Sequence, residues 1–315
     1  MYKQAIAMST RSQKLSQLGK NVLSVHVTTR CQANCDHCLC VGQDIPDIST
    51  SDCPPIVSAI GSLNIKTIRL TGGEPTLCME LVEVLLKEVL KIHPHVALEL
   101  STNAHFAKSH ESCERVLGSI PNIRAVAVSY DRFHERYVDN HSIKLLIESC
   151  RKLNIEVTGF ASIASPHDLC DVLDYENDFG IPFKYQQVIP IGNALKKDIR
   201  FPYKVFEVGV LDQVCPQSSS LIYIPSYGFT SCCSSLFFKS NKITRTLLAN
   251  MNAELFLKSE FYRAVTSYTF GNLAARLDDG SAFVPDDSCP CELCYKILPR
   301  IIRPLNGSSQ ARSLI

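Results

Sequence analysis

The stretch RCQANCDHCLC, residues 30–40, places four cysteines within ten positions. It directly follows VLSVHVT (22–28), a run of β-branched and aliphatic residues that is typical of a buried strand. Two further loops, TGGEP (71–75) and STNAH (101–105), follow the next two runs of this kind. Because loops that leave parallel strands gather at the carboxyl-terminal edge of a sheet, we expect these three loops to meet on one rim.

Strand-like and helix-like segments alternate about six times between residues 22 and 190. Helical spacing of apolar residues predicts helices over 77–92 and 143–153. The predicted strands cover 22–28, 66–71, 96–102, 123–129, 155–163 and 183–189. This alternation predicts an α/β fold with a parallel sheet and right-handed crossovers. The periodicity fits an open doubly wound sheet and a partial barrel equally well.

The alternation stops after about residue 200. LIYIPSYGFTS (221–231) predicts a hairpin that turns at Pro225–Gly228, and the segment 243–265 is rich in helical patterning. We therefore divide the chain into an N-terminal segment (1–20), a main α/β domain (21–200), a small C-terminal extension of hairpin and helices (201–300) and a tail (301–315).

Composition and charge restrict the classes of function. The 315-residue chain is 45% apolar and 20% charged, with a net charge of +1, so we expect no nucleic-acid partner. It has neither an apolar run of membrane-spanning length nor a secretory signal, so we expect no membrane partner and a cytoplasmic location. In that compartment 15 cysteines favour metal or redox chemistry over disulfides. Isolated cysteines are expected to be small buried hydrophobes: Cys53, Cys78, Cys113, Cys150 and Cys170.

The spacing Cys31-x3-Cys35-x2-Cys38 does not suit a structural zinc site, which needs four ligands that commonly come in two close pairs. The spacing of a ferredoxin electron-transfer cluster is also absent. Three thiolates from one loop suit three corners of a cubane iron–sulfur cluster. The fourth iron would then be open to another ligand.

These cysteines, with the aromatic His37 before the last of them, resemble the signature loop of the radical S-adenosylmethionine superfamily. The resemblance implies a partial (β/α)6 barrel in which the triad holds a [4Fe–4S] cluster and S-adenosylmethionine chelates the open iron. Reductive cleavage then gives a 5′-deoxyadenosyl radical that abstracts hydrogen from a substrate carbon. It further implies that Gly72 and Gly73 let the backbone approach the cofactor and that Glu74 holds its ammonium group. By position, further cofactor contacts would come from Ser101, Asn103, Ser129, Ser162 and Ile189, although each could equally be an ordinary polar or capping residue of a loop.

A second set of cysteines lies in the C-terminal extension. Cys215, the segment Gly228-x4-Cys233 and Cys291-x2-Cys294 resemble Twitch, a truncated SPASM extension. The resemblance implies one auxiliary [4Fe–4S] cluster, with Cys215, Cys233, Cys291 and Cys294 as its four ligands and Cys289 to spare. A four-cysteine structural zinc site would satisfy the same spacings.

Two thiols and one charged loop remain as candidates for catalysis. Cys232 is expected to face away from the auxiliary site, because adjacent side chains of a strand point to opposite faces. There it could return a hydrogen atom to a substrate radical, as epimerases of the superfamily do; Cys40 is the second candidate. In SYDRFHERYV (129–138), Asp131 and His134 are expected at the rim, either facing substrate or at a solvated helix start.

The favoured activity is epimerisation of a peptide or small natural product. Dehydrogenation of a sugar alcohol or aminoglycoside and peptide cross-linking are the alternatives within the superfamily. From the short N-terminal segment we expect no separate leader-binding domain, and this expectation keeps small carbohydrate substrates open. An external one-electron donor, such as flavodoxin or ferredoxin, is the expected partner. A non-catalytic iron–sulfur or zinc protein would explain the cysteines but not TGGEP.

Overall fold

The computed structural model describes residues 21–218, 220–277 and 282–302. By their internal contacts these residues form two units, each described by itself. Asn21–Phe201 with Tyr223–Ser226 form the barrel unit, and the described residues of Pro202–Ile222 and of the chain from Tyr227 onward form the C-terminal unit. The segments expected at 1–20 and, but for its first two residues, at 301–315 lie outside the described residues.

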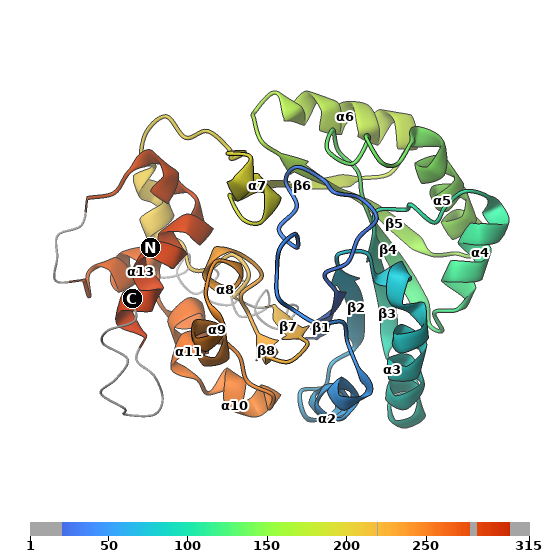
Figure 1. The fold of residues 1–315 in the computed structure, drawn as a ribbon, viewed down its shortest axis with the longest axis horizontal. Coiled ribbons are helices and arrows are strands. Elements are labelled where there is room, and N and C mark those ends of the chain that lie inside the picture. The colour runs from blue at the N-terminus through green and yellow to red at the C-terminus, as the bar shows by residue number, and fades with distance from the viewer. Residues whose placement is uncertain (1–20, 219, 278–281, 303–315) are drawn as a thin grey trace, which may run out of the picture. The chain divides into compact units, whose positions relative to one another are not determined.

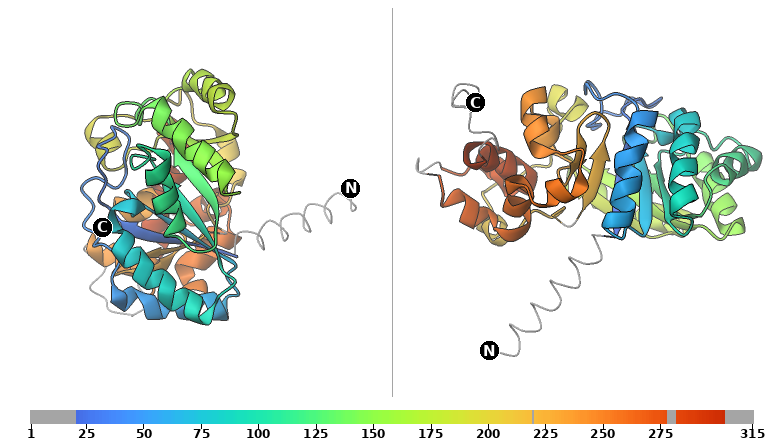
Figure 2. Two further views of the ribbon diagram at one scale, coloured as in Figure 1. Left: turned by 90° about the vertical axis from the view of Figure 1, so that its right-hand side faces the viewer. Right: turned by 90° about the horizontal axis from the view of Figure 1, so that it is seen from below.

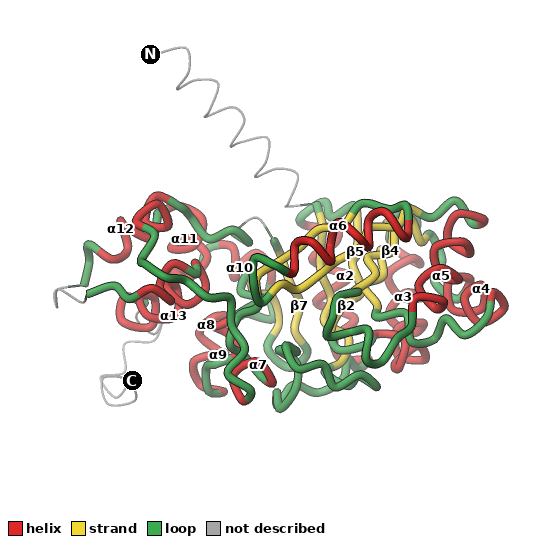
Figure 3. The backbone as a smooth tube through the Cα atoms, turned by 90° about the horizontal axis from the view of Figure 1, so that it is seen from above, coloured by secondary structure: helices red, strands yellow, loops and turns green. Residues whose placement is uncertain are grey.

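Six parallel strands form the sheet of the barrel unit in the order β6-β5-β4-β3-β2-β1. The strands are β1 (Val22–Thr28), β2 (Thr67–Gly72), β3 (Ala97–Thr102), β4 (Ile123–Ser129), β5 (Glu156–Ile163) and β6 (Phe183–Gln187). All six predicted strands are confirmed, within one or two residues at each end. Figure 3 shows the strands side by side in yellow.

Helices connect successive strands of this unit. They are α2 (Cys53–Ser62), α3 (Met79–Ile92), α4 (His110–Gly118), α5 (Asn140–Lys152) and α6 (Asp168–Phe179), and the short α7 (Asn193–Lys196) follows β6. Figures 1 and 2 show α3 to α6 along the outer face of the sheet. The ordered repeat of strand and helix is the partial (β/α)6 barrel that the resemblance implied.

Local sequence explains where these helices begin and end. Asp139 caps α5 by accepting a hydrogen bond from the amide of Ser142 at 2.7 Å, and Ser109 caps α4 in the same way. Gly180 ends α6 in the left-handed conformation, with φ of 61°. In β3, buried and half-buried residues alternate strictly, so Leu98 and Leu100 share one face with Thr102.

The C-terminal unit contains short helices joined by loops (Figure 3). They are α8 (Ser235–Phe238), α9 (Lys242–Leu248), α10 (Ala253–Leu257), α11 (Glu260–Ser267), α12 (Phe270–Ala274) and α13 (Pro290–Ile301). Side-chain caps from Asn241, Asn252, Ser259 and Thr269 account for the close spacing of their starts. The predicted hairpin is confirmed as β7 (Leu221–Ile224) and β8 (Gly228–Thr230).

Two simpler expectations have clear outcomes. Four of the five isolated cysteines are buried, but Cys170 in α6 is exposed, so the expectation for it was wrong. It occupies a solvent-facing position of an amphipathic helix. In the described part of the chain, no helix is both long and apolar enough to cross a membrane.

Candidate active site

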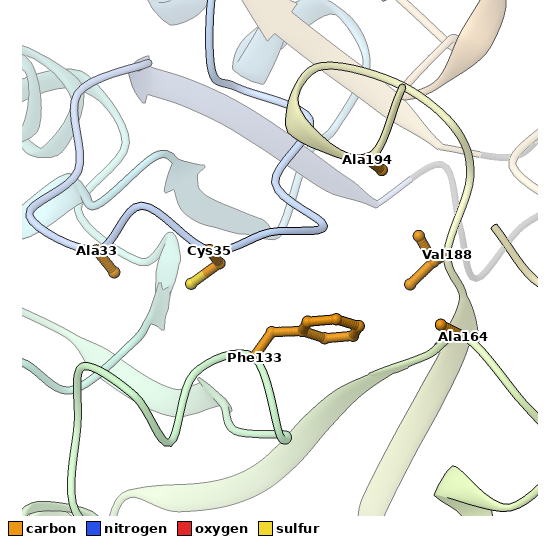
Figure 4. Close-up of a cluster of buried hydrophobic side chains, with 6 residues drawn as sticks. All are labelled: Ala33, Cys35, Phe133, Ala164, Val188 and Ala194. Atoms are coloured by element: carbon orange, nitrogen blue, oxygen red, sulfur yellow. The ribbon is translucent and has the colours of Figure 1, made fainter. Parts of the chain in front are cut away.

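The first cysteine cluster lies in the long loop between β1 and α2. Cys35 is buried beside Phe133, Ala164 and Val188, and Cys31 and Cys38 pack against the same apolar group (Figure 4). Burial raises the pKa of Cys31 to about 12, and the charges of Cys38 and Cys35 contribute to the shift. Three thiols therefore come together in a largely buried site. Three thiolates there would repel one another, so they would need a bound cation. Soft sulfur donors of this kind fit an iron–sulfur cluster.

The glycines of TGGEP are required by the approach of two stretches of backbone. A Cβ on Gly72, whose φ is +142°, would lie 2.3 Å from the carbonyl oxygen of Thr28. A Cβ on Gly73 would lie 2.2 Å from that of Arg30. The amides of Gly73 and Glu74 donate to these same two carbonyls at 2.6 and 2.8 Å. The two glycines therefore hold TGGEP against the chain that enters the cysteine loop, and their expected approach to the cofactor stays a prediction.

Glu74 is fully buried and joins the loops that follow β2 and β3. Its carboxylate accepts hydrogen bonds from the amide of Asn103 at 2.8 Å and from the hydroxyl of Thr102 at 3.0 Å. Thr76 adds its amide at 3.2 Å and its hydroxyl at 2.7 Å. Burial raises the pKa of Glu74, against the lowering effect of these donors. These protein donors tie the Glu74 carboxylate to the loops after β2 and β3, and its expected contact with the cofactor's ammonium group stays a prediction.

The other predicted cofactor-contacting residues lie at the carboxyl ends of the strands. Asn103 is buried, and its side-chain amide donates to the sulfur of Cys31 at 3.3 Å. Ser101 and Ser129 are half-buried in β3 and β4, and Ile189 is half-buried just after β6. Ser162 is buried in β5 and its amide is engaged by Asp131 at 2.8 Å. The structure thus brings these residues to one edge of the sheet.

The loop after β4 forms turns, not the helix start considered from sequence. Asp131 is 4% exposed, and its carboxylate accepts a hydrogen bond from the ring Nδ1 of His134 at 2.9 Å. Burial would raise the pKa of Asp131, but His134 and amide donors outweigh it and the pKa falls to about 2. Burial would lower the pKa of His134, but the Asp131 carboxylate reverses this and raises the pKa to about 10.

His37 lies beside this pair, 5.1 Å from the ring of His134 between centroids and 4.7 Å from that of Phe133. Ligand atoms of His37, Asp131 and His134 lie within 4.8 Å of one another. Because Asp131 is already saturated by protein donors, this grouping favours a hydrogen-bonded support over a metal site.

Sequence reasoning missed the residues that hold the cysteine loop from the far side. The side-chain amide of Asn193 donates to the carbonyl of Cys35 at 3.1 Å and to Asn34 at 2.8 Å. A Cβ on Gly192 would lie 2.5 Å from the carbonyl oxygen of Cys38. Arg136 pairs with Asp36 at 2.7 Å. The Gly-Asn pair after β6 was the available signal, because glycine followed by a polar side chain marks close backbone approach.

The second cysteine set gathers within the C-terminal unit. Cys215 precedes the hairpin, Cys232 and Cys233 follow it, and Cys291 and Cys294 lie one turn apart on α13. Burial raises the pKa of Cys233 to about 12, with contributions from the charges of Cys232 and Cys215. Burial also raises the pKa of Cys294, with contributions from the same two thiols.

Cys289 is also part of this set. It interacts with Cys291, which also interacts with Cys233. Six thiols therefore come together, two more than one cluster needs.

The expectation that Cys232 and Cys233 point to opposite faces of a strand was wrong in its premise. Strand β8 ends at Thr230, and both cysteines lie in the bend that leads to α8. Cys232 interacts electrostatically with Cys215 and Cys294, so it belongs to the same group of thiols as the expected ligands.

Comparisons with known proteins agree with this architecture, although no protein-family model matches the chain. The chain is 24% identical over 233 residues to the putative peptide biosynthesis protein YydG of Bacillus subtilis, covering 70% of this chain and 72% of that protein. It is 28% identical over 188 residues to the GTP 3′,8-cyclase of Clostridium perfringens, covering 55% of this chain and only 57% of the cyclase. Its fold resembles native anSMEcpe with bound AdoMet and the Cp18Cys peptide, with a TM-score of 0.52, 11% identity and coverage of 89% and 97% of the two chains.

The partial barrel, the cysteine triad after its first strand and these similarities match the features of radical S-adenosylmethionine enzymes. The residues of the triad fit the superfamily's cluster, since three mutually interacting thiols share one dry site.

Proposed function

We propose that this enzyme epimerises a residue of a peptide, with Cys232 as the thiol that returns hydrogen. The observation that carries the proposal is the group of six thiols in the C-terminal unit, where four suffice for one cluster. Similarity to a putative peptide biosynthesis protein supports a peptide substrate.

Cys31, Cys35 and Cys38 would hold a [4Fe–4S] cluster, and S-adenosylmethionine bound at its open iron would supply a 5′-deoxyadenosyl radical on receiving one electron. Ser101, Asn103, Ser129, Ser162 and Ile189 would line its site, beside His37 and the TGGEP loop. Asn103 holds the sulfur of Cys31, and Asn193 holds the loop that carries Cys35. These contacts keep the site preorganised and apolar. An external one-electron donor, such as flavodoxin or ferredoxin, would supply the electron.

Epimerisation balances as follows. The substrate would give one C–H hydrogen atom to that radical, which would leave a substrate carbon radical and 5′-deoxyadenosine. Cys232 then gives its S–H hydrogen to the opposite face of that carbon. The resulting thiyl radical regains one electron from the external donor and one proton from water.

We further propose that Cys215, Cys233, Cys291 and Cys294 hold one auxiliary [4Fe–4S] cluster in a Twitch-like extension. A zinc ion held by the same four cysteines is the alternative. The cysteine triad of the barrel unit, which suits a cubane, favours iron over zinc for this second set of thiols as well.

Cys40 is the weaker candidate for hydrogen donation. It is 5% exposed and shares a hydrogen bond with Cys38, one of the triad. Cys232 is half-buried.

The test is turnover in D2O of a short peptide that stimulates the formation of 5′-deoxyadenosine by the reconstituted enzyme. Cys232→Ala should still form 5′-deoxyadenosine but stop deuterium from entering the peptide. Cys170→Ala removes an exposed cysteine and should behave as wild type. Normal turnover by both Cys232→Ala and Cys40→Ala would contradict the proposal that a cysteine thiol returns the hydrogen atom. Loss of two hydrogens from the product would instead indicate dehydrogenation or cross-linking.

A further inference from the structure

Asp131 was a candidate for contact with substrate, but its surroundings assign it elsewhere. Its Oδ1 accepts from the amides of Phe133 at 2.9 Å and His134 at 3.1 Å, and from the His134 ring at 2.9 Å. Its Oδ2 accepts from the amide of Ser162 at 2.8 Å. A carboxylate with four donors and 4% exposure is an orienting group, because no side of it is left for an exchangeable partner.

The group that Asp131 orients is His134. Their contact commits Nδ1 of the imidazole, so Nε2 is the nitrogen left for another partner. His134 also interacts with the thiol of Cys35, the buried member of the triad. Phe133, the neighbouring residue, packs in the same apolar cluster as Cys35 (Figure 4). The side chain of His134 is only 12% exposed, so water competes little for this contact.

We infer that His134, oriented by Asp131, is a positioning residue that donates a hydrogen bond to the sulfur of Cys35 when the cluster is bound, and so raises the cluster's reduction potential. Hydrogen bonds to ligand sulfurs are among the means by which proteins tune iron–sulfur potentials, since they stabilise the more negative, reduced state. The inference rests on the triad holding a cluster, and not on the epimerisation proposed above.

A second N–H group lies beside another cysteine of the triad. Asn103, at the end of β3, donates to the sulfur of Cys31 at 3.3 Å. His134, after β4, serves Cys35. Two of the three ligand sulfurs thus receive N–H groups from the ends of neighbouring strands. Easier reduction of the cluster is the shared consequence.

The experiment is an anaerobic redox titration of the reconstituted full chain, followed by electron paramagnetic resonance. The signal to follow is the one that changes on adding S-adenosylmethionine, which separates this cluster from an auxiliary one. His134→Phe keeps an aromatic ring but removes the donor, and should shift the midpoint potential to more negative values. His134→Gln keeps an N–H donor and should retain most of the wild-type potential. The matched control is His110→Phe, because His110 contacts Ser149 and Glu148 of α5.

Equal potentials in wild type, His134→Phe and His134→Gln would overturn the inference. If His134→Phe fails to load iron, Asp131→Asn decides: it should also shift the potential negatively, and an unchanged value overturns the inference. Failure of the proposed epimerisation would leave these potentials as they are, because they are measured without a peptide.

Discussion

The backbone amide of Glu74 donates to the carbonyl of Arg30 across 2.8 Å, and so ties the TGGEP loop to the residue before Cys31. This contact exists because Gly73 has no side chain: a Cβ there would lie 2.2 Å from the same oxygen. The register of β1 and β2 shifts between His26 and Thr28, just before the two loops meet.

Gly73→Ala should therefore destabilise the protein by more than about 1 kcal/mol, because the two loops must separate to admit the methyl group. Anaerobic urea unfolding measures the change in free energy. Gly118→Ala is the matched control, since a Cβ at Gly118 meets nothing within 4 Å. Equal stability of Gly73→Ala and wild type would contradict the close approach.

Replacing any one of Cys31, Cys35 and Cys38 by serine should abolish the formation of 5′-deoxyadenosine. Iron content should fall by about four per chain, the content of one [4Fe–4S] cluster. The physical reason is that each thiolate holds one corner of a cluster with no spare protein ligand. Colorimetric iron and chromatography of 5′-deoxyadenosine measure both effects. A variant that keeps its iron and its activity would remove that cysteine from the triad.

Cys294→Ser should lose the other roughly four irons and retain reductive cleavage of S-adenosylmethionine without substrate. The two cysteine sets lie in separate units, so loading of one should not require the other. Iron and activity assays on the reconstituted variant test this, with the exposed Cys170→Ser as control. The assignment fails if wild type holds only about four irons and Cys294→Ser holds as many.

The stability of the fold should fall between pH 6.5 and pH 4 because of His26. Burial lowers the pKa of this β1 histidine from 6.5 to about 4. Between these values the unfolded chain binds a proton that the folded chain excludes, so stability rises with pH and the contribution is lost as pH falls. The full difference is about 3 kcal/mol.

His26→Gln, which cannot take up that proton, should flatten this pH dependence. Urea unfolding of the anaerobic protein at pH 7.5, 6.5 and 5.5 measures it. His95→Gln removes an exposed histidine for comparison. An identical slope in wild type and His26→Gln would show that His26 is not the group responsible.

The sequence predicted the barrel strands well because each is a short apolar run bounded by turn signals, as in Ile123–Ser129, where prediction and structure coincide. It predicted β6 less well, since the ladder ends at Gln187 while the apolar pattern continues to Ile189. The apolar pattern reflects burial and not strand pairing. Val188 lies beyond the end of the strand but is still buried in the core.

The site was predictable as far as local spacing defines it. The triad, TGGEP and the C-terminal cysteines are visible because their residues are near one another in the chain. The role of Asn193 was not predictable from local spacing. Its contact with Cys35 spans 158 positions and forms only because the fold brings the segment after β6 beside the loop after β1. The setting of Asp131 was missed for a similar reason: its burial depends on the amide of Ser162, 31 positions away.

Glu74 links the carboxyl-terminal ends of three neighbouring strands. Its side chain is shared by the ends of β2 and β3, while its own amide is held by the end of β1. A designer who grafts the three-cysteine loop alone onto another parallel sheet would leave a charged group without its donors and two glycines without their neighbour. The three-cysteine loop can therefore be transferred to another protein only together with the ends of β1, β2 and β3.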